Sequence, residues 1–294
     1  MAPVTQLRKI AVAALFISVS ASALGAQEVG PSAGSLVIVG GALRDPAILE
    51  RFIDLAGGPD APIVVIPTAG AEDRYDEYWP GLKQFREAGA TNLTVLHTRD
   101  RDEADTNDFV VPLAAARGVW FTGGRQWRLA DSYLHTRVHR ELVALLERGG
   151  VIGGSSAGAT IQGSYLVRGD TKTNTIMMGD HEEGFGFLEG VAIDQHLMRR
   201  NRQFDLIEVI EAKPDLLGIG IDENTAIIVR GDMFEVMGES YVAMYDHNKM
   251  LDSGGRFYLL APGDRFDLGT RQAYRLSPSA EPFERVEEHA WPGR

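Results

Sequence analysis

Short runs of consecutive apolar residues alternate with segments of helical periodicity through the first half of the chain. Such runs indicate strands of a parallel sheet that is covered on both faces, because both sides of each strand must then be apolar. Alternation of strand and helix predicts an α/β fold with right-handed crossovers. The expected strands are 36–39, 63–66, 93–96, 118–121 and 151–154, and the expected helices are 46–56, 75–88 and 126–146.

The second half of the chain has a different pattern. A helix is expected over 159–165. Residues 168–190 are polar and rich in glycine, and they are expected to form a loop near the functional site. Apolar and polar residues then alternate from Met233 to Tyr245, which predicts antiparallel edge strands. The expected fold class is therefore α/β, with a mostly parallel sheet, helices on both of its faces and antiparallel strands toward the C-terminus. Further elements are expected as a charged surface loop at 100–108, a strand pair or hairpin at 217–221 and 225–229, and a strand at 256–260.

One catalytic domain is expected over residues 35–275, because no repeat and no low-complexity linker interrupts it. Residues 276–294 are charged and contain proline, and they are expected to form a peripheral tail. Residues 1–26 have the form of a secretory signal peptide, in which Arg8 and Lys9 precede an apolar stretch and small residues. The apolar stretch is short for a membrane span. We therefore expect a secreted or periplasmic protein with no membrane association after cleavage.

Composition excludes several classes of site. The formal net charge of -12 argues against nucleic acid as a partner. The absence of cysteine excludes disulfides, cysteine nucleophiles and thiolate metal sites. Two of the expected strands are followed by glycine pairs, Gly40-Gly41 and Gly123-Gly124. Neither G-x-G-x-x-G nor G-x-x-x-x-G-K-[ST] occurs, which argues against a nucleotide site. We expect no organic cofactor, and no metal, because no second histidine stands at ligand spacing from His181.

Residues 154–158 match G-x-S-x-G, the pattern of a nucleophile elbow. A serine at a sharp turn between strand and helix projects its hydroxyl above the sheet edge, and small neighbours let the strand and the helix approach closely. The Ala157 N–H, at the helix start, can then face a developing oxyanion. The same pattern also fits a tight turn without chemistry, so Ser156 needs partners elsewhere in the chain.

A nucleophilic serine needs a base, and the base needs an orienting acid. Of seven histidines, His196 is the strongest candidate, because polar residues surround it and three arginines follow it. His97, which follows a strand, is a weaker one. The acid candidates are Asp222 and Glu223, which lie together between two apolar runs and could equally form a hairpin tip. Arginines after the base suit recognition of a carboxylate, since the planar guanidinium binds it through two hydrogen bonds.

Taken together, these stretches resemble peptidase family S51, and within it the cyanophycinases. The matching stretches are 36–42, 65–69, 121–124 with Gln126, 154–159, 194–196 and 218–226, which cover most of the chain after the leader. The resemblance implies a fold similar to class I glutamine amidotransferases, a peptide or cyanophycin-like polymer as substrate, cleavage to β-Asp-Arg dipeptides, and a homodimer.

The resemblance also implies a role for individual residues. Ser156 would be the nucleophile, His196 the general base and Glu223 the orienting acid. The backbone N–H groups of Gly124 and Ala157 would form the oxyanion hole. The residues expected to line the substrate pocket are Gln126, Asp194, Gln195, Arg199, Arg200 and Arg202.

One residue departs from the family pattern. The family usually has an acid between the second glycine pair and Gln126, where this chain has Arg125. A positive charge at that place could alter the choice of substrate. Two alternatives therefore stay open beside cyanophycin hydrolysis: an S51 dipeptidase acting on aspartyl or isoaspartyl peptides, and a non-catalytic periplasmic binding protein that kept the fold.

Overall fold

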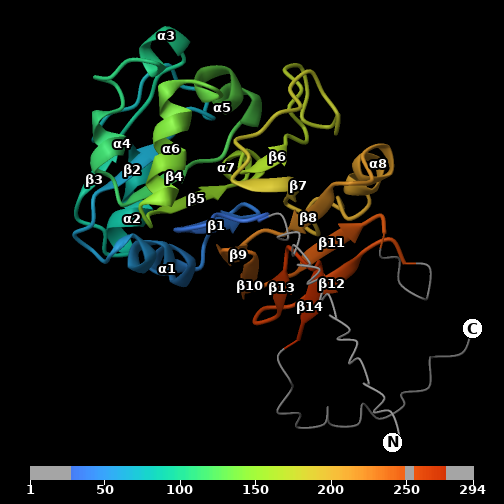
Figure 1. Ribbon diagram of the computed structural model, residues 1–294. Helices are drawn as coiled ribbons and strands as arrows, with labels where there is room; N and C mark the ends of the chain where they lie inside the picture. Colours follow the sequence, from blue (N-terminus) through green and yellow to red (C-terminus); the bar gives the residue numbers. More distant parts are fainter. Residues whose placement is uncertain (1–27, 249–254, 276–294) are drawn as a thin grey trace, which may run out of the picture.

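The computed structural model describes residues 28–248 and 255–275 of the chain. The expected signal peptide at 1–26 and the expected tail at 276–294 lie outside the described residues. In the part described, the strands form a sheet of nine and a sheet of five, with helices packed against them (Figure 1).

The larger sheet has a parallel half and an antiparallel half. Strands β3, β2, β4, β5 and β1 run parallel, whereas β9, β10, β13 and β14 continue the sheet in antiparallel pairs. The strands in spatial order are β14 (Gln272–Tyr274), β13 (Arg265–Asp267), β10 (Met233–Gly238), β9 (Thr225–Arg230), β1 (Ser35–Val39), β5 (Val151–Ser155), β4 (Gly118–Phe121), β2 (Ile63–Ile66) and β3 (Leu93–Val95).

The smaller sheet also mixes both directions. Strands β6, β7 and β8 are parallel, and β11 and β12 follow β8 in antiparallel pairs. Its spatial order is β12 (Tyr258–Leu260), β11 (Val242–Asp246), β8 (Leu217–Ile221), β7 (Leu188–Gln195) and β6 (Gly163–Tyr165).

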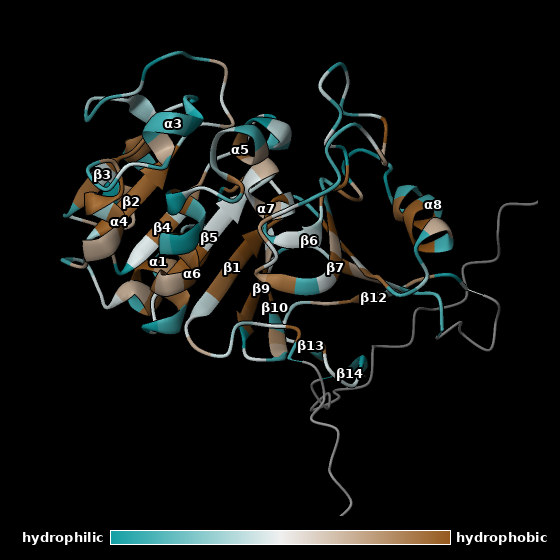
Figure 2. Ribbon diagram, turned by 45° about the horizontal axis from the view of Figure 1, so that its top comes forward, coloured by the Kyte–Doolittle hydropathy of each residue, from teal (hydrophilic) through white to brown (hydrophobic). Residues whose placement is uncertain are grey.

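Helices cover both faces of the parallel half, as β1 shows. Its residues Leu36 and Ile38 belong to one hydrophobic core with α5 and α6, and Val37 and Val39 belong to the opposite core with α1 and α2. Figure 2 shows the hydrophobic residues concentrated in strands such as β1 and β9, while α3 is largely hydrophilic. The helices are α1 (Pro46–Ala56), the 3₁₀ turn η1 (Pro80–Leu82), α2 (Lys83–Glu87), α3 (Arg101–Ala104), α4 (Val111–Ala115), α5 (Gln126–Tyr133), α6 (Arg137–Glu147), α7 (Ala157–Thr160) and α8 (Asp205–Ala212).

The structure confirms the expected α/β class, with its parallel core, covered faces and antiparallel C-terminal strands. It corrects the pairing of β8 and β9. The hairpin expected at 217–221 and 225–229 is wrong, because β8 pairs with β7 and β11 whereas β9 pairs with β1 and β10. The short connection between them passes from one sheet to the other. The expected edge strands β10 and β11 are likewise interior, since each has a hydrogen-bonded strand on both sides.

Three expected helices are shorter than predicted. In 75–88, helix begins only at Pro80, because a proline disfavours helical geometry at the preceding Trp79, whose ψ is 125°. The expected 126–146 helix is broken near His135, whose φ is 63°. The expected 159–165 helix ends at Thr160, and its second half is strand β6. The charged loop at 100–108 includes the short helix α3, which the Asp100 carboxylate caps.

Candidate active site

Ser156 lies at the turn between β5 and α7, with φ 57° and ψ −112°. This backbone conformation is strained for a residue with a side chain, and it persists only where the surroundings enforce it. They do so here through close packing of glycines. A Cβ on Gly154 would lie 2.1 Å from the carbonyl oxygen of Gly158, and one on Gly158 would lie 2.2 Å from that of Phe121. The small residues of the G-x-S-x-G pattern are therefore required by contact.

A chain of hydrogen bonds links Ser156 to two residues far away in the sequence. The Ser156 Oγ lies 3.0 Å from Nε2 of His196, and Nδ1 of the same ring lies 2.7 Å from Oε1 of Glu223. The His196 and Glu223 side chains are 8% and 14% exposed, so the bond between them is shielded from water. Serine, histidine and carboxylate thus stand in the order in which a serine hydrolase uses them.

The end of β1 places these segments relative to one another. The carbonyls of three consecutive residues there each accept one backbone N–H from a segment of the site. These bonds run from Ser156 to Val39 (3.0 Å), from His196 to Gly40 (2.8 Å) and from Asn224 to Gly41 (2.8 Å). Because strand β1 belongs to the larger sheet and His196 follows β7 of the smaller sheet, these bonds also join the two sheets at the site.

Two glycines after β1 leave room for this arrangement. A Cβ on Gly41, whose φ is 126°, would lie 2.3 Å from Cε1 of the His196 ring. A Cβ on Gly40 would lie 2.2 Å from the carbonyl oxygens of Ile221 and Asp222. In the sequence the pair marked a strand end and part of the family resemblance; in the structure Gly41 lies directly against the imidazole of His196.

The environment of His196 keeps its imidazole neutral. Burial lowers the pKa of His196 below the ordinary value of 6.5, and the positive charges of Arg200 and Arg202 lower it further. The hydrogen bond to Glu223 opposes these effects without cancelling them. A neutral imidazole at neutral pH can accept the proton of the Ser156 hydroxyl.

Two backbone amides beside the serine are free to bind an oxyanion. Gly123 packs against Ser156, since a Cβ on Gly123 would lie 3.3 Å from the Ser156 Cβ. Gly124 follows with φ 146°, a conformation that brings its Cα against the Ala69 carbonyl. Within 28–248 and 255–275, the N–H groups of Gly124 and Ala157 have no hydrogen-bond acceptor.

The two acid candidates serve different purposes. Glu223 contacts His196, whereas the Asp222 carboxylate accepts the backbone N–H groups of Met198 and Arg199 and the hydroxyl of Ser240. Asp222 thus fixes the start of the segment after the histidine. The other histidines considered bond elsewhere: His97 to Thr68, and His181 to Asp131 and Asp180.

The six residues expected to line the substrate pocket fall into two groups. Arg199 and Arg200 are exposed. The other four are buried and bonded within the protein. Gln126 donates to the carbonyls of Val167 and Arg168, Asp194 accepts from Arg168, and Gln195 accepts from Arg202 through both its side-chain and its backbone oxygen.

Arg168 was not singled out in the sequence, although it binds Asp194, one of the residues expected to line the substrate pocket. Its side chain is 2% exposed and donates two hydrogen bonds, of 2.7 and 2.9 Å, to the carboxylate of Asp194, with a further ion pair to Asp205. Asp194 lies two residues before His196. The glycine-rich stretch from 168 was expected near the site, but no local signal links an arginine to a carboxylate 26 residues away.

The model of peptidase family S51 matches residues 35–237. The chain belongs to peptidase family S51. It is 33% identical over 267 residues to a cyanophycinase of Geminocystis herdmanii, covering 81% of this chain and 95% of that one. It is 32% identical over 264 residues to a cyanophycinase of Nostoc sp., covering 81% and 86%. The protein is therefore a hydrolase of the peptidase class, and its Ser–His–Glu arrangement fits the serine type.

Solved structures agree with this assignment. A peptidase from an acI-B1 Actinobacterium superposes with a TM-score of 0.60 at 26% identity, covering 81% of this chain and 98% of that one. A putative peptidase E of Listeria monocytogenes, at 18% identity and a TM-score of 0.51 over 70% and 99%, shares the fold. Among the described residues, no group of three or more histidines and carboxylates could hold a metal ion, and no helix is long and apolar enough to cross a membrane.

Proposed function

We propose that this S51 peptidase hydrolyses cyanophycin, a poly-aspartate with arginine side groups, and releases β-Asp-Arg dipeptides through an acyl-enzyme. The observation that carries the proposal is the hydrogen-bonded chain from Ser156 through His196 to Glu223, beside the amides of Gly124 and Ala157 that find no acceptor in the described part of the chain. The cyanophycinases among its relatives, which match over most of their length, support the choice of substrate.

In the acylation step, Nε2 of His196 takes the proton of the Ser156 hydroxyl as Oγ attacks the scissile carbonyl. The carbonyl oxygen becomes an oxyanion, which the N–H groups of Gly124 and Ala157 bind. One such donor contributes about 3–4 kcal/mol to transition-state stabilisation. His196 then gives its proton to the leaving amine, and the carbonyl carbon stays bonded to Ser156 as an ester.

In the deacylation step, water attacks that ester, and His196 takes one proton from the water and returns it to Ser156 Oγ. Glu223 accepts a hydrogen bond from Nδ1 of His196 through both steps, which holds the correct tautomer and stabilises the imidazolium. The sequence of steps consumes one water for each bond cleaved.

Substrate recognition falls first to the exposed Arg199 and Arg200, which can bind a carboxylate of the substrate. The buried residues Gln126, Asp194, Gln195 and Arg202 act in this proposal by holding the walls of the pocket in place.

A second candidate function, an aspartyl or isoaspartyl dipeptidase, is favoured by one observation. Arg125, next to Gly124, donates through Nη2 to the backbone carbonyl of Asp170, and its buried Nε has no partner among the described residues. A guanidinium beside the amides favours a substrate with a negative group near the cleaved bond and disfavours a cationic one. A non-catalytic binding protein remains as the third reading.

We further propose that the protein acts outside the cytoplasm, in the periplasm or the medium, on the strength of the signal-like leader at 1–26. Expression of the full chain in a Gram-negative host, followed by N-terminal sequencing of the periplasmic and medium fractions, tests this. A processed N-terminus near residue 26 supports export, and a full-length chain confined to the cytoplasm contradicts it.

The test of function is incubation of the mature protein with purified cyanophycin, beside the Ser156→Ala variant, with products followed by mass spectrometry. Release of β-Asp-Arg by the wild type alone supports the proposal. If the folded wild type releases nothing, Asp-X and isoaspartyl dipeptides are supplied next, and their cleavage supports the dipeptidase. Failure of a serine-directed fluorophosphonate to label Ser156 would support the non-catalytic reading.

A further inference from the structure

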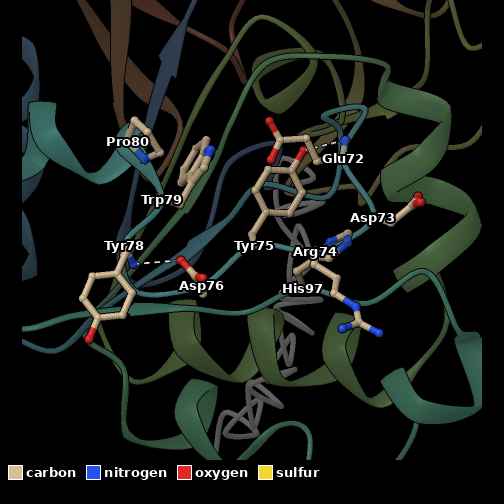
Figure 3. A pocket seen from close by; sticks show the side chains of 9 residues that line it. All are labelled: Glu72, Asp73, Arg74, Tyr75, Asp76, Tyr78, Trp79, Pro80 and His97. Carbon is tan, nitrogen blue, oxygen red and sulfur yellow. Dashed lines mark hydrogen bonds between the residues drawn. The ribbon is translucent and has the colours of Figure 1, made fainter.

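A cavity of about 460 Å³ lies at the carboxyl ends of β2 and β3, away from Ser156 itself. Its lining comes from the loop after β2 and from one residue after β3 (Figure 3). The volume falls in the range of small-ligand sites, and this edge of a parallel sheet is where α/β proteins bind ligands. We call it the 72–80 pocket, lined by Glu72, Asp73, Arg74, Tyr75, Asp76, Tyr78, Trp79, Pro80 and His97.

The walls of the pocket are aromatic. The Tyr75 ring meets Trp79 edge-to-face at 5.3 Å and 85°, and it meets His97 in the same way at 4.9 Å and 84°. In Figure 3 the Tyr75 ring lies between the Trp79 ring and Glu72. Aromatic faces held at right angles present a rigid surface on which a planar cation such as a guanidinium can stack.

The charges of the pocket have both signs. The Asp73 carboxylate forms an ion pair with Arg99, whose Nη1 donates to its Oδ1 at 3.0 Å. In the described part of the chain, neither the Glu72 carboxylate nor the Arg74 guanidinium has a hydrogen-bond or ion-pair partner. Asp76 adds a carboxylate whose Oδ1 accepts the Tyr78 N–H. A ligand that pairs with both Glu72 and Arg74 carries a cation and an anion.

The pocket is in contact with the candidate active site through a short series of residues. The Tyr75 hydroxyl packs against Gly70, where an added Cβ would lie 2.1 Å from it. The neighbouring Ala69 carbonyl accepts the Arg125 N–H at 2.9 Å and packs against Gly124, which follows the Gly123 that packs against Ser156. The segment from Ala69 to Tyr75 therefore joins the pocket to the residues beside Ser156, and the proposal is that a substrate longer than the cleaved unit spans this distance.

We propose that the 72–80 pocket binds the side group of a second substrate residue, one that carries both a guanidinium and a free carboxylate. An arginine joined to aspartate through its α-amino group has both. Its guanidinium stacks on the Tyr75 and Trp79 walls beside Glu72 and Asp76, and its carboxylate pairs with Arg74. The identity of this side group rests on the proposed cyanophycin activity, but the pocket's preference for a zwitterion does not.

Binding is measured without hydrolysis, on the full-length Ser156→Ala protein, by equilibrium titration with three probes. Nα-acetyl-L-arginine carries both charges, Nα-acetyl-L-citrulline lacks the cation, and Nα-acetyl-L-argininamide lacks the anion. The variants are Glu72→Gln and Arg74→Gln. The matched control is Glu77→Gln, an equally exposed charge change in the same loop but outside the lining.

Each variant should weaken only the two probes that carry the charge opposite to the one it removes. Glu72→Gln should weaken acetyl-arginine and acetyl-argininamide by roughly three- to fivefold and leave acetyl-citrulline unchanged. Arg74→Gln should weaken acetyl-arginine and acetyl-citrulline by a similar factor and leave acetyl-argininamide unchanged. Glu77→Gln should change none. If Glu72→Gln and Arg74→Gln behave like Glu77→Gln, or if the three probes bind equally, the proposal is wrong.

Hydrolysis by the enzyme with Ser156 intact separates this proposal from the proposed function. Glu72→Gln and Arg74→Gln should raise KM for the polymer by roughly three- to fivefold with kcat unchanged. For a short substrate that contains a single cleavable β-Asp-Arg unit, both variants should have the KM of the wild type. A wild type that shows the binding pattern but cleaves no cyanophycin would refute the function and keep the pocket. A wild type that cleaves it with variants of unchanged KM would refute the pocket and keep the function.

Discussion

Replacement of Gly41 by alanine tests whether the backbone after β1 positions His196 for the base role proposed for it. The new Cβ would lie 2.3 Å from Cε1 of His196. Non-bonded carbon atoms approach to about 3.5 Å, so the ring must move by about 1.2 Å. The ring is held by bonds of 3.0 Å to Ser156 and 2.7 Å to Glu223, and at least one of them must lengthen.

A misplacement of about 1 Å in a catalytic group costs about 10²-fold in rate, or about 2.7 kcal/mol of activation free energy. We therefore expect Gly41→Ala to lower kcat/KM by about 10²-fold. The rate of fluorophosphonate labelling of Ser156 should fall by a similar factor, and this assay does not depend on the substrate.

The backbone strain at Gly41 is separated from the displacement of the ring by a control. Gly58 has φ 101°, yet a Cβ there meets nothing within 4 Å. Gly58→Ala should therefore cost stability through strain alone, about 1–3 kcal/mol, with activity unchanged. Thermal unfolding of both variants is measured beside the kinetics. A folded Gly41→Ala protein with kcat/KM within about threefold of the wild type would refute the reasoning.

Three further predictions concern the same network. Glu223→Gln should lower kcat by about 10³–10⁴-fold, whereas Asp222→Asn, which alters only the capping of the following segment, should lower it far less; equal losses in steady-state assays would contradict the assignment of the acid. Arg200→Gln removes a charge that disfavours the imidazolium, so the pKa of His196 should rise. The acid limb of the kcat/KM profile, measured from about pH 4 to about pH 9, should then move to higher pH, and a limb that stays in place or moves to lower pH would refute this cause of the shift. Asp194→Asn leaves the buried Arg168 with a neutral partner, so the free energy of unfolding should fall by about 3 kcal/mol. The unfolding midpoint in calorimetry should fall by about 6–12 °C, and an unchanged midpoint would show that the pair is not needed for stability.

The parts of the fold that the sequence predicted are those set by local periodicity. The buried strands β1, β2 and β4 were expected within one residue of their bounds, since runs such as Ile63–Ile66 are apolar on both faces. The errors arose where tertiary contacts override local pattern. Nothing local distinguishes β8 and β9 from a hairpin, because their separation depends on partners in two sheets.

The candidate site shows the same division. The turn at Ser156 was visible because glycines must flank it, and the structure has that turn. The choice between Asp222 and Glu223 was open, since two adjacent carboxylates differ only in what each side chain reaches. The buried ion pair between Arg168 and Asp194 could not be predicted from the sequence, because Asp194 was interpreted only as a residue of the substrate pocket. The roles of the substrate residues stay predictions.

The end of β1 explains why residues from three distant segments can act together. The backbone N–H groups of Ser156, His196 and Asn224 reach the successive carbonyls of Val39, Gly40 and Gly41, so one short stretch of chain at the end of β1 fixes the spacing of the segments that carry Ser156, His196 and Glu223. Glycines are needed directly after the strand, because a Cβ on Gly40 would lie 2.2 Å from the carbonyl oxygens of Ile221 and Asp222 and one on Gly41 would lie 2.3 Å from the His196 ring. The positions of Ser156 and His196 are therefore expected to be more sensitive to changes at Gly40 and Gly41 than to changes at the exposed Arg199 and Arg200, neither of which bears on the backbone bonds that join these segments.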